Sequence, residues 1–490
     1  MTLADARADA RRRAFDLAFL FVAKAAIGAY VLRTGFSHVS DDDYARVVIA
    51  QSFAHAPAFD PSGTSWLPFP FWLSGGAMMV LGRSLDAARA IAFALGVVSV
   101  AFPYAAMRAV GCGRATALGA VIVAMALPWN AWLGVATVPE AMTACLIAAG
   151  AIATASRDGK TRVVGASCLF AAALSRYEAW PVCAVMAAAC AVGLLRVASP
   201  GRLSPANPHP PAPSPARGEG ERTAMSPPLS PGGRGAGGEG ARETGRESAQ
   251  LALALIIAIA GPLAWMAWNA HAHGSATHFV ARVAAYRQAM GAASQPLAEK
   301  LAAFPRAVVV TSPMIVGLAA IGSIAFVIDP AVRARWSWPL ASAIALLAFL
   351  AYGDASDGAP THHPERAVIP VLWILAAFAA DALRALATRV AWARPAREMW
   401  VVGAGMAGVI AWGATLPARL RDHPASASDE SRDIQIARGL ALPPDAHIRV
   451  TPCAYEHFAL IAAFAAPERA DIAPSSPSPV TPRCPRVEIR

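Results

Sequence analysis

Long stretches of apolar residues recur along most of this chain, and they decide what it can fold into. A helix needs about 20 apolar residues to cross the hydrocarbon core of a bilayer. The chain offers about eleven such stretches, near residues 14–33, 87–107, 115–133, 138–155, 162–175, 179–195, 250–268, 307–328, 337–352, 367–383 and 399–416. We therefore expect an all-α polytopic membrane protein with about eleven transmembrane helices.

The composition supports this class and excludes others. Charged residues make up only 15% of the 490 residues and hydrophobic residues 56%, whereas a soluble chain carries about 25% charge. The net charge of +10 does not indicate nucleic acid as a partner, because the arginines fall in short runs between apolar stretches. None of the seven cysteines forms a C-x-x-C pair, so no zinc or redox site is expected.

Basic residues predict the orientation in the membrane. Arg7, Arg11, Arg12 and Arg13 precede the first stretch, which lacks a small-residue cleavage site. We interpret it as a retained helix with its basic end in the cytoplasm. We number the loops between these stretches in chain order. The even-numbered loops then all carry basic residues, namely Arg108 and Arg114; Arg157, Lys160 and Arg162; Arg196; Arg333 and Arg335; and Arg384, Arg389, Arg394 and Arg397. The positive-inside rule thus predicts that the odd loops lie on the outer, extracytoplasmic face of the membrane.

Residues 66–82 form a short apolar segment that we do not count as a span. Pro68 and Pro70 lie at its start, and Trp66 and Trp72 suit headgroup depth. Counting it as a span would invert the orientation of every later loop. We expect a juxtamembrane helix on the outer face, and an ordinary spanning helix is the alternative.

The remaining segments divide the chain into four parts. Residues 1–197 and 250–416 are the two transmembrane halves, the first of them expected to be catalytic. Residues 198–249 are rich in Pro, Gly and Ser and predict a disordered cytoplasmic insertion. Residues 417–490 predict a small extracytoplasmic α/β tail, with a helix near 433–438, a strand at 447–450 and a second helix at 455–464. Cys453 and Cys484 in this tail either pair in an oxidising periplasm or stay unpaired.

Unusual polar residues gather on the predicted outer face. Loop one carries Asp41, Asp42 and Asp43, and Glu140 opens a later helix. A carboxylate at such a site can deprotonate an acceptor hydroxyl or amine. Other polar residues on this face, namely Arg176, Arg366 and His363, are candidates to bind a donor phosphate, for which guanidinium groups are well shaped.

Each of these residues also has a purely structural interpretation. Asp43 can stabilise the start of a helix and Glu140 can be a first-turn acid. Arg176 can form a local ion pair with Glu178. Asp41, Asp43 and Glu140 could also supply oxygen ligands to a divalent cation, although no cofactor is required by the sequence.

The arrangement resembles the C-type (GT-C) glycosyltransferases, and within them the protein O-mannosyltransferases and the bacterial aminoarabinose lipid A transferases. The resemblance covers roughly residues 14–383. Four features carry it: the acids of Asp41-Asp42-Asp43-Tyr44-Ala-Arg46, the Pro-bearing segment Leu67-Pro-Phe-Pro-Phe-Trp72, the acid in Pro139-Glu140, and the late arginine in Pro364-Glu365-Arg366.

The resemblance implies a membrane enzyme that moves a sugar from a polyprenyl-phosphate carrier to a lipid, glycan or protein acceptor on the periplasmic face. An acid among Asp41 to Asp43 would be the base, and Glu140 would match a second acidic position. Two departures stand out. Ser40 occupies the place where the family more often has the first acid, so Asp41 and Asp42 both remain candidates. The Pro-Phe-Pro segment lacks the lysine of the lipid A transferases, which argues against an aminoarabinose donor.

A flippase or transporter of lipid-linked sugars, without transferase activity, is the alternative. Such a protein is expected to contain internal repeats or paired broken helices, and we find no repeat outside residues 198–249.

Overall fold

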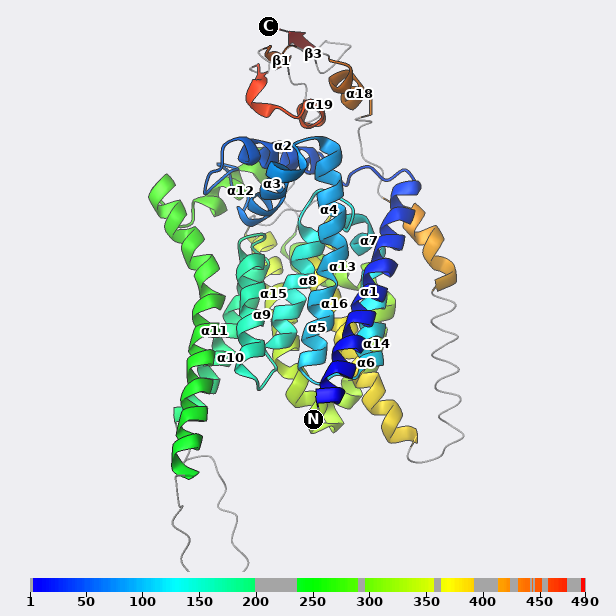
Figure 1. Ribbon diagram of the computed structural model, residues 1–490, viewed down its shortest axis with the longest axis vertical. Helices are drawn as coiled ribbons and strands as arrows, with labels where there is room; N and C mark the ends of the chain where they lie inside the picture. Colours follow the sequence, from blue (N-terminus) through cyan, green and yellow to red (C-terminus); the bar gives the residue numbers. More distant parts are fainter. Residues whose placement is uncertain are drawn as a thin grey trace, which may run out of the picture.

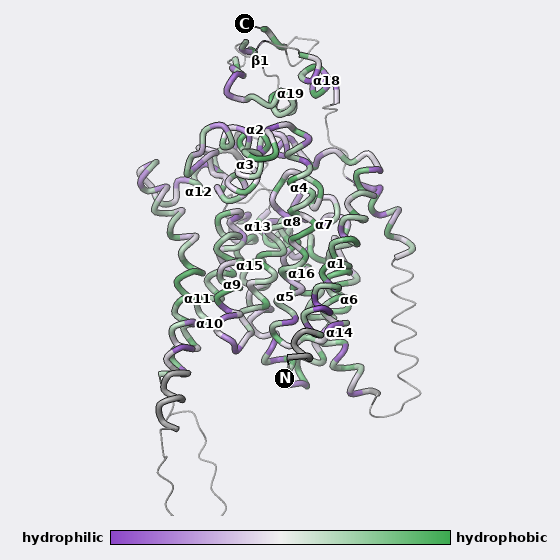
Figure 2. The backbone as a smooth tube through the Cα atoms, in the orientation of Figure 1, coloured by the Kyte–Doolittle hydropathy of each residue, from purple (hydrophilic) through white to green (hydrophobic). Residues whose placement is uncertain are grey.

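The computed structural model describes residues 3–198, 236–289, 296–356, 363–391, 413–423, 431–440, 443, 446–451, 457–473 and 486–489. Most of the helices run along one axis and form a bundle (Figure 1). Hydrophobic residues predominate through the middle of this bundle (Figure 2). The N-terminus lies at one end, and α2 (Asp42–His55), α3 (Phe69–Leu81) and α12 (His278–Ala289) lie at the other, which we call the α2 end.

Six helical segments among the described residues are long and apolar enough to cross a bilayer. They are α1 (Leu3–Arg33), the pair α4 (Leu85–Ser99) and α5 (Ala101–Ala109), α10 (Ala179–Ala198), α11 (Ala236–His273), α15 (Pro330–Ala355) and α16 (Pro364–Ala391). Helices α13 (Leu297–Thr311) and α14 (Pro313–Ile328) are bent by 96° relative to each other, and this pair makes a seventh segment if it is counted as one span. The protein is therefore a multi-pass membrane protein by the length and composition of its helices.

The prediction of about eleven spans is not confirmed, because several apolar stretches form shorter helices. They are α6 (Arg114–Met125), α7 (Pro128–Leu133), α8 (Glu140–Ala153) and α9 (Gly159–Ala173). At 1.5 Å per residue, helices of this size reach no more than about 23 Å, less than the hydrocarbon core of about 30 Å. Stretch 115–133 is divided before Pro128 and stretch 307–328 before Pro313. Stretch 399–416 falls outside the described residues except for its last four, which are helical.

Close contacts hold the short helices inside the bundle. Lys24 of α1 is 2% exposed, and its Nζ donates to the Met125 carbonyl at 3.3 Å and the Asn130 carbonyl at 2.9 Å. Met125 is the last residue of α6, where carbonyls lack helical partners. Every residue of α8 except Met142 is buried. The N-terminus of α8, with Glu140, is therefore enclosed by protein.

Helices α2 and α3 pack against each other across the α2 end. At 13 residues α3 is too short to span, as the prolines and tryptophans of its segment indicated. A Cβ on Gly75 of α3 would lie 2.6 Å from Phe53 and 2.7 Å from the Ala50 carbonyl. Only glycine permits this close approach of the two helices.

The described parts of residues 431–489, which we call the C-terminal unit, lie beyond α2 (Figure 1). They contain α18 (Ser431–Gly439), β1 (Ile448–Thr451), α19 (His457–Phe464), η1 (Pro467–Arg469), β2 (Ala470–Ile472) and β3 (Arg486–Ile489). The strand order is β2-β1-β3, with β2 parallel and β3 antiparallel to β1. Ile448 and Val450 of β1 pack on Leu460 and Ile461 of α19.

One sequence prediction is corrected by the structure, and others concern residues outside the described part of the chain. Helix α11 begins at Ala236, so the last part of the segment 198–249 is helical rather than disordered. A helix that already exists adds a hydrogen bond with each further residue. This explains why α11 extends beyond its apolar stretch on the N-terminal side. Residues 199–235, and Cys453 and Cys484 with their predicted pairing, lie outside the described residues.

Candidate functional site

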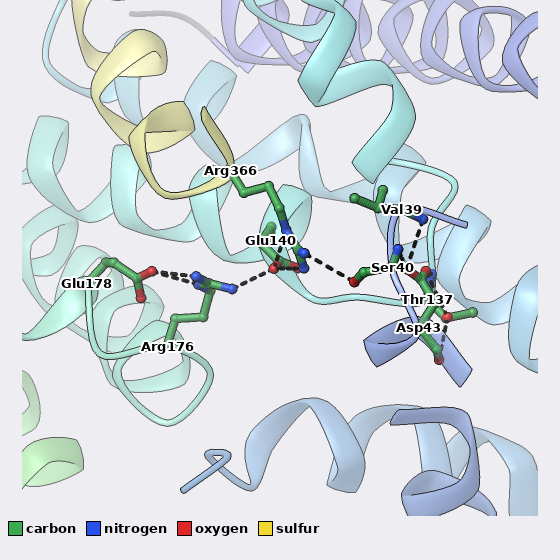
Figure 3. A network of polar contacts seen from close by, with 8 residues as sticks. All are labelled: Val39, Ser40, Asp43, Thr137, Glu140, Arg176, Glu178 and Arg366. Carbon is green, nitrogen blue, oxygen red and sulfur yellow. Dashed lines mark hydrogen bonds and ion pairs between the residues drawn. The ribbon is translucent and has the colours of Figure 1, made fainter. Parts of the chain in front are cut away.

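A network of charged side chains joins four parts of the chain at the α2 end (Figure 3). Glu140 Oε1 accepts hydrogen bonds from Arg176 Nη1 at 2.5 Å and from Nε of Arg366 at 3.1 Å, and it forms an ion pair with Nη2 of Arg366. Arg176 also donates to Glu178 Oε1, from Nε at 3.0 Å and from Nη2 at 2.5 Å. Two carboxylates and two guanidinium groups therefore neutralise one another.

This arrangement affects the charged state of Arg176. Burial by itself would lower the pKa of its guanidinium, but the adjacent carboxylates of Glu178 and Glu140 raise that pKa above its usual value. Glu140 has a side chain only 1% exposed and two cationic partners. It is held as a charged structural link between α8 and α16, and its Oε1 has no room for a proton from an acceptor.

Asp43 extends the network into loop one. Arg366 Nη1 donates to Ser40 Oγ at 3.3 Å, and the Ser40 N–H donates to Asp43 Oδ2 at 3.2 Å. Asp43 Oδ2 also accepts from the Val39 N–H at 3.0 Å, and Oδ1 accepts from the Thr137 N–H at 2.9 Å and Oγ1 at 3.1 Å. Burial raises the pKa of the Asp43 carboxyl, against the opposing effects of the Arg366 charge and these amides. Asp43 thus fastens loop one to the turn before α8.

Asp41 and Asp42 differ from Asp43 in that both are partly exposed. Asp41 lies at the N-cap of α2 without a side-chain capping bond, so the capping interpretation does not describe it. Asp42 makes no hydrogen bond or ion pair with the described residues, yet its charge acts on both Arg46 and Arg176. Asp42 is therefore a carboxylate of the cluster that lies near enough to influence both arginines and has no partner among the described residues.

Arg46, one helical turn after Asp42, is the residue that sequence reasoning missed. It is 9% exposed, and its Nε and Nη1 are buried without a hydrogen-bond partner. Its Cζ lies 4.4 Å from the ring centroid of Trp66 and 5.7 Å from that of Phe71. Burial lowers the pKa of this guanidinium, which the charges of Glu140 and Asp42 oppose. Aromatic rings hold the cation in place and leave two of its donors unused.

Arg46 lies in the wall of an apolar cavity. The cavity is open to solvent on one side, and its volume of about 600 Å³ includes this open space; α2, α3, α4 and the residues around the start of α8 line it. Most of its lining is aliphatic, including Val47, Met78, Ile91 and Leu95. An apolar hollow with a single buried cation fits a ligand that has an apolar part and one anionic group.

No protein-family model matches this chain, and no curated protein matches it either. The family resemblance of the sequence motifs therefore stays an expectation.

A smaller cavity, of about 190 Å³ when the space open to solvent is included, lies beside the network, between α8 and α16. Two buried atoms without hydrogen-bond partners, Glu140 Oε2 and Thr143 Oγ1, belong to residues that line it. Unpaired polar groups around a cavity are the setting in which proteins bind ordered water.

Two further sequence candidates have other surroundings. His363 has a φ of 55°, and its ring centroid lies 5.4 Å from that of Trp129 in α7. The acids considered for a divalent cation do not form an oxygen cage: both oxygens of Asp43 and Oε1 of Glu140 accept from protein donors, and the described residues contain no group of three or more potential ligands.

A signal for Arg46 was present in the sequence. It is the only charged residue within the apolar run from Ala45 to Ala50 and stands four residues after Asp42, on the same face of a helix. The sequence could not show that Arg46 has no acidic hydrogen-bond partner, because this depends on how the arginines of distant segments pair with Glu140.

Proposed function

We propose that the protein is a membrane glycosyltransferase that moves a sugar from a polyprenyl-phosphate-linked donor to a lipid, glycan or protein acceptor at the periplasmic face of the inner membrane. The observation that carries this proposal is the buried, unpaired Arg46 in the wall of an apolar cavity, with the open carboxylate of Asp42 one helical turn away. The cavity suits the isoprenoid chain and Arg46 suits its phosphate.

In this proposal Asp42 is the general base. It takes the proton of an acceptor hydroxyl while the acceptor oxygen bonds to the anomeric carbon of the sugar. The bond between that carbon and the phosphate oxygen breaks, and its electron pair leaves with the lipid phosphate. Arg46 stabilises the leaving group because the phosphate gains a negative charge as it departs.

Arg176, Arg366 and Glu140 have a supporting role in the same proposal. The two arginines already share Glu140, so a phosphate would have to compete with a buried carboxylate for them. We assign the donor phosphate to Arg46 and regard the Glu140 network as the frame that holds loop one and α8 together.

Reconstituted protein tests this function directly. Proteoliposomes that contain the protein are given a radiolabelled polyprenyl-phosphate sugar, and transfer to lipid, glycan and protein acceptors is measured. Replacement of a general base lowers the rate by about a hundred- to ten-thousand-fold, so Asp42→Asn should lose transfer on that scale. Asp41→Asn is the matched control, since it removes a neighbouring carboxylate and should retain most of the rate. Translocation of the donor without transfer would instead support the flippase alternative.

A further inference from the structure

Helix α2 separates the candidate site from the C-terminal unit. Asp42 and Arg46 share one face of α2, and the helical period places Tyr44, Val48 and Gln51 on the opposite face. Tyr44 packs in one apolar cluster with Ala459 and Ala462 of α19. A shift of the C-terminal unit against α2 would therefore move the side chains of the site.

Gln51 is the polar centre of this contact. It is 0% exposed, and its Nε2 donates to the Ala462 carbonyl at 2.8 Å and to the Arg83 carbonyl at 2.7 Å. Ala462 lies in the last turn of α19, where carbonyls lack helical partners. Arg83 lies in the turn between α3 and α4. One side-chain amide thus joins α2, the C-terminal unit and the turn that connects two walls of the cavity.

A second interaction lies beside this amide. Nη1 and Nη2 of Arg83 donate to the two carboxylate oxygens of Glu468 at 2.8 and 2.9 Å. Both side chains are only a quarter to a third exposed, and paired hydrogen bonds of this kind restrict orientation as well as distance.

The apolar contact is also continuous with the cavity. Val47, Ala50 and Met78 belong to the cluster that includes the C-terminal unit, and the same residues line the cavity. Packing of α19 on α2 therefore adjoins the volume that would receive the lipid chain.

We infer that the C-terminal unit is a clamp that sets the position of α2, with Gln51 as the positioning residue. The inference rests on the proposed function in so far as Asp42 and Arg46 of α2 carry the reaction. Catalytic groups that are misplaced by about 1 Å can lose about a hundredfold in rate. Loss of the clamp should therefore lower turnover although no clamp residue touches a substrate.

Hydrogen–deuterium exchange of the full-length protein in nanodiscs tests the clamp without any substrate. In Gln51→Leu, which has no amide donor, the α2 amides should exchange about 10 to 100 times faster than in wild type, and peptides from α1 and α16 should be unchanged. Ser52→Ala is the matched control, because Ser52 Oγ donates only to the Val48 carbonyl within α2. Glu468→Gln weakens the same junction from the other side and should give a smaller increase.

Sugar transfer measured on the same variants completes the test. The inference is supported if turnover falls together with the protection of α2 and stays normal in Ser52→Ala. It is overturned if Gln51→Leu and Glu468→Gln both leave α2 exchange at the wild-type rate, or if α2 loosens while turnover is unchanged. If wild-type protein transfers no sugar but α2 still loosens in both variants, the clamp is supported and only the proposed function fails.

Discussion

Replacing Arg46 with methionine should stabilise the empty protein and abolish donor binding. The guanidinium is buried with two nitrogens that lack hydrogen-bond partners, and a buried charge without a hydrogen-bonded partner costs several kcal/mol. Cation–π contacts of Arg46 with Trp66 and Phe71 offset about 1 to 2 kcal/mol of this cost. Methionine fills a similar volume without charge, so we expect a gain of about 1 to 2 kcal/mol in the free energy of unfolding.

The effect on the ligand has the opposite sign. Each hydrogen bond from a charged donor contributes about 1.5 to 3 kcal/mol. Two such bonds from the unused Nε and Nη1 of Arg46 to a phosphate correspond to about a hundred- to ten-thousand-fold in affinity. Arg46→Met should therefore lose nearly all of its affinity for polyprenyl phosphate while its melting temperature rises.

Thermal unfolding with and without polyprenyl phosphate measures both quantities, because a ligand that binds the folded state raises the melting temperature. Arg438→Met is a suitable control, since Arg438 is half exposed and pairs with Asp86 at the surface; it should change neither stability nor the ligand-induced shift. The reasoning is refuted if Arg46→Met melts lower than wild type and keeps the full ligand-induced shift.

Three further outcomes follow from other contacts. Glu140→Gln leaves the buried Arg366 without a charge partner and Arg176 with Glu178 alone, and it should cost about 3 to 5 kcal/mol of stability; normal melting with complete loss of turnover would instead make Glu140 a catalytic acid or base. Gly96→Ala places a Cβ 2.1 Å from the Gly134 carbonyl oxygen and should lower the melting temperature and the folded yield, whereas Gly119→Ala, with no heavy atom within 4 Å, should not. Burial tends to raise the pKa of Glu468, but its hydrogen bonds with Arg83 hold that pKa below its usual value of about 4.5. The contribution of Glu468 to stability should therefore be complete above about pH 4.5 and disappear as pH falls through the lowered folded-state pKa, and the difference in melting temperature between wild type and Glu468→Gln should shrink over that window.

The sequence predicted the elements whose signals are local. The prolines and tryptophans around residue 70 indicated a short helix, and α3 is one. The segment predicted as a strand at 447–450 overlaps β1 (Ile448–Thr451). These features depend on neighbouring residues, so they can be recognised without knowledge of the rest of the fold.

Features that depend on distant partners could not be predicted in the same way. Hydropathy counted stretch 138–155 as a span, but α8 is a short helix enclosed by others, and burial by protein has the same apolar signature as burial by lipid. The sequence kept both Asp41 and Asp42 as candidates for the base. The structural role of Asp43 depends in part on its contact with Thr137, 94 residues away, which no local pattern could predict.

The double ion pair of Glu140 has a consequence for how the protein is made. Arg176 follows Glu140 by 36 residues, but Arg366 follows it by 226. At about 5 to 20 residues per second, the second arginine is synthesised tens of seconds after the first. During this interval the Glu140 carboxylate lies in the membrane region, and Arg176 is the only one of its two ion-pair partners that has been synthesised. We therefore expect Arg176→Ala to cause early degradation of the nascent protein, visible by pulse labelling, and Arg366→Ala to be inserted normally and to weaken only the finished bundle.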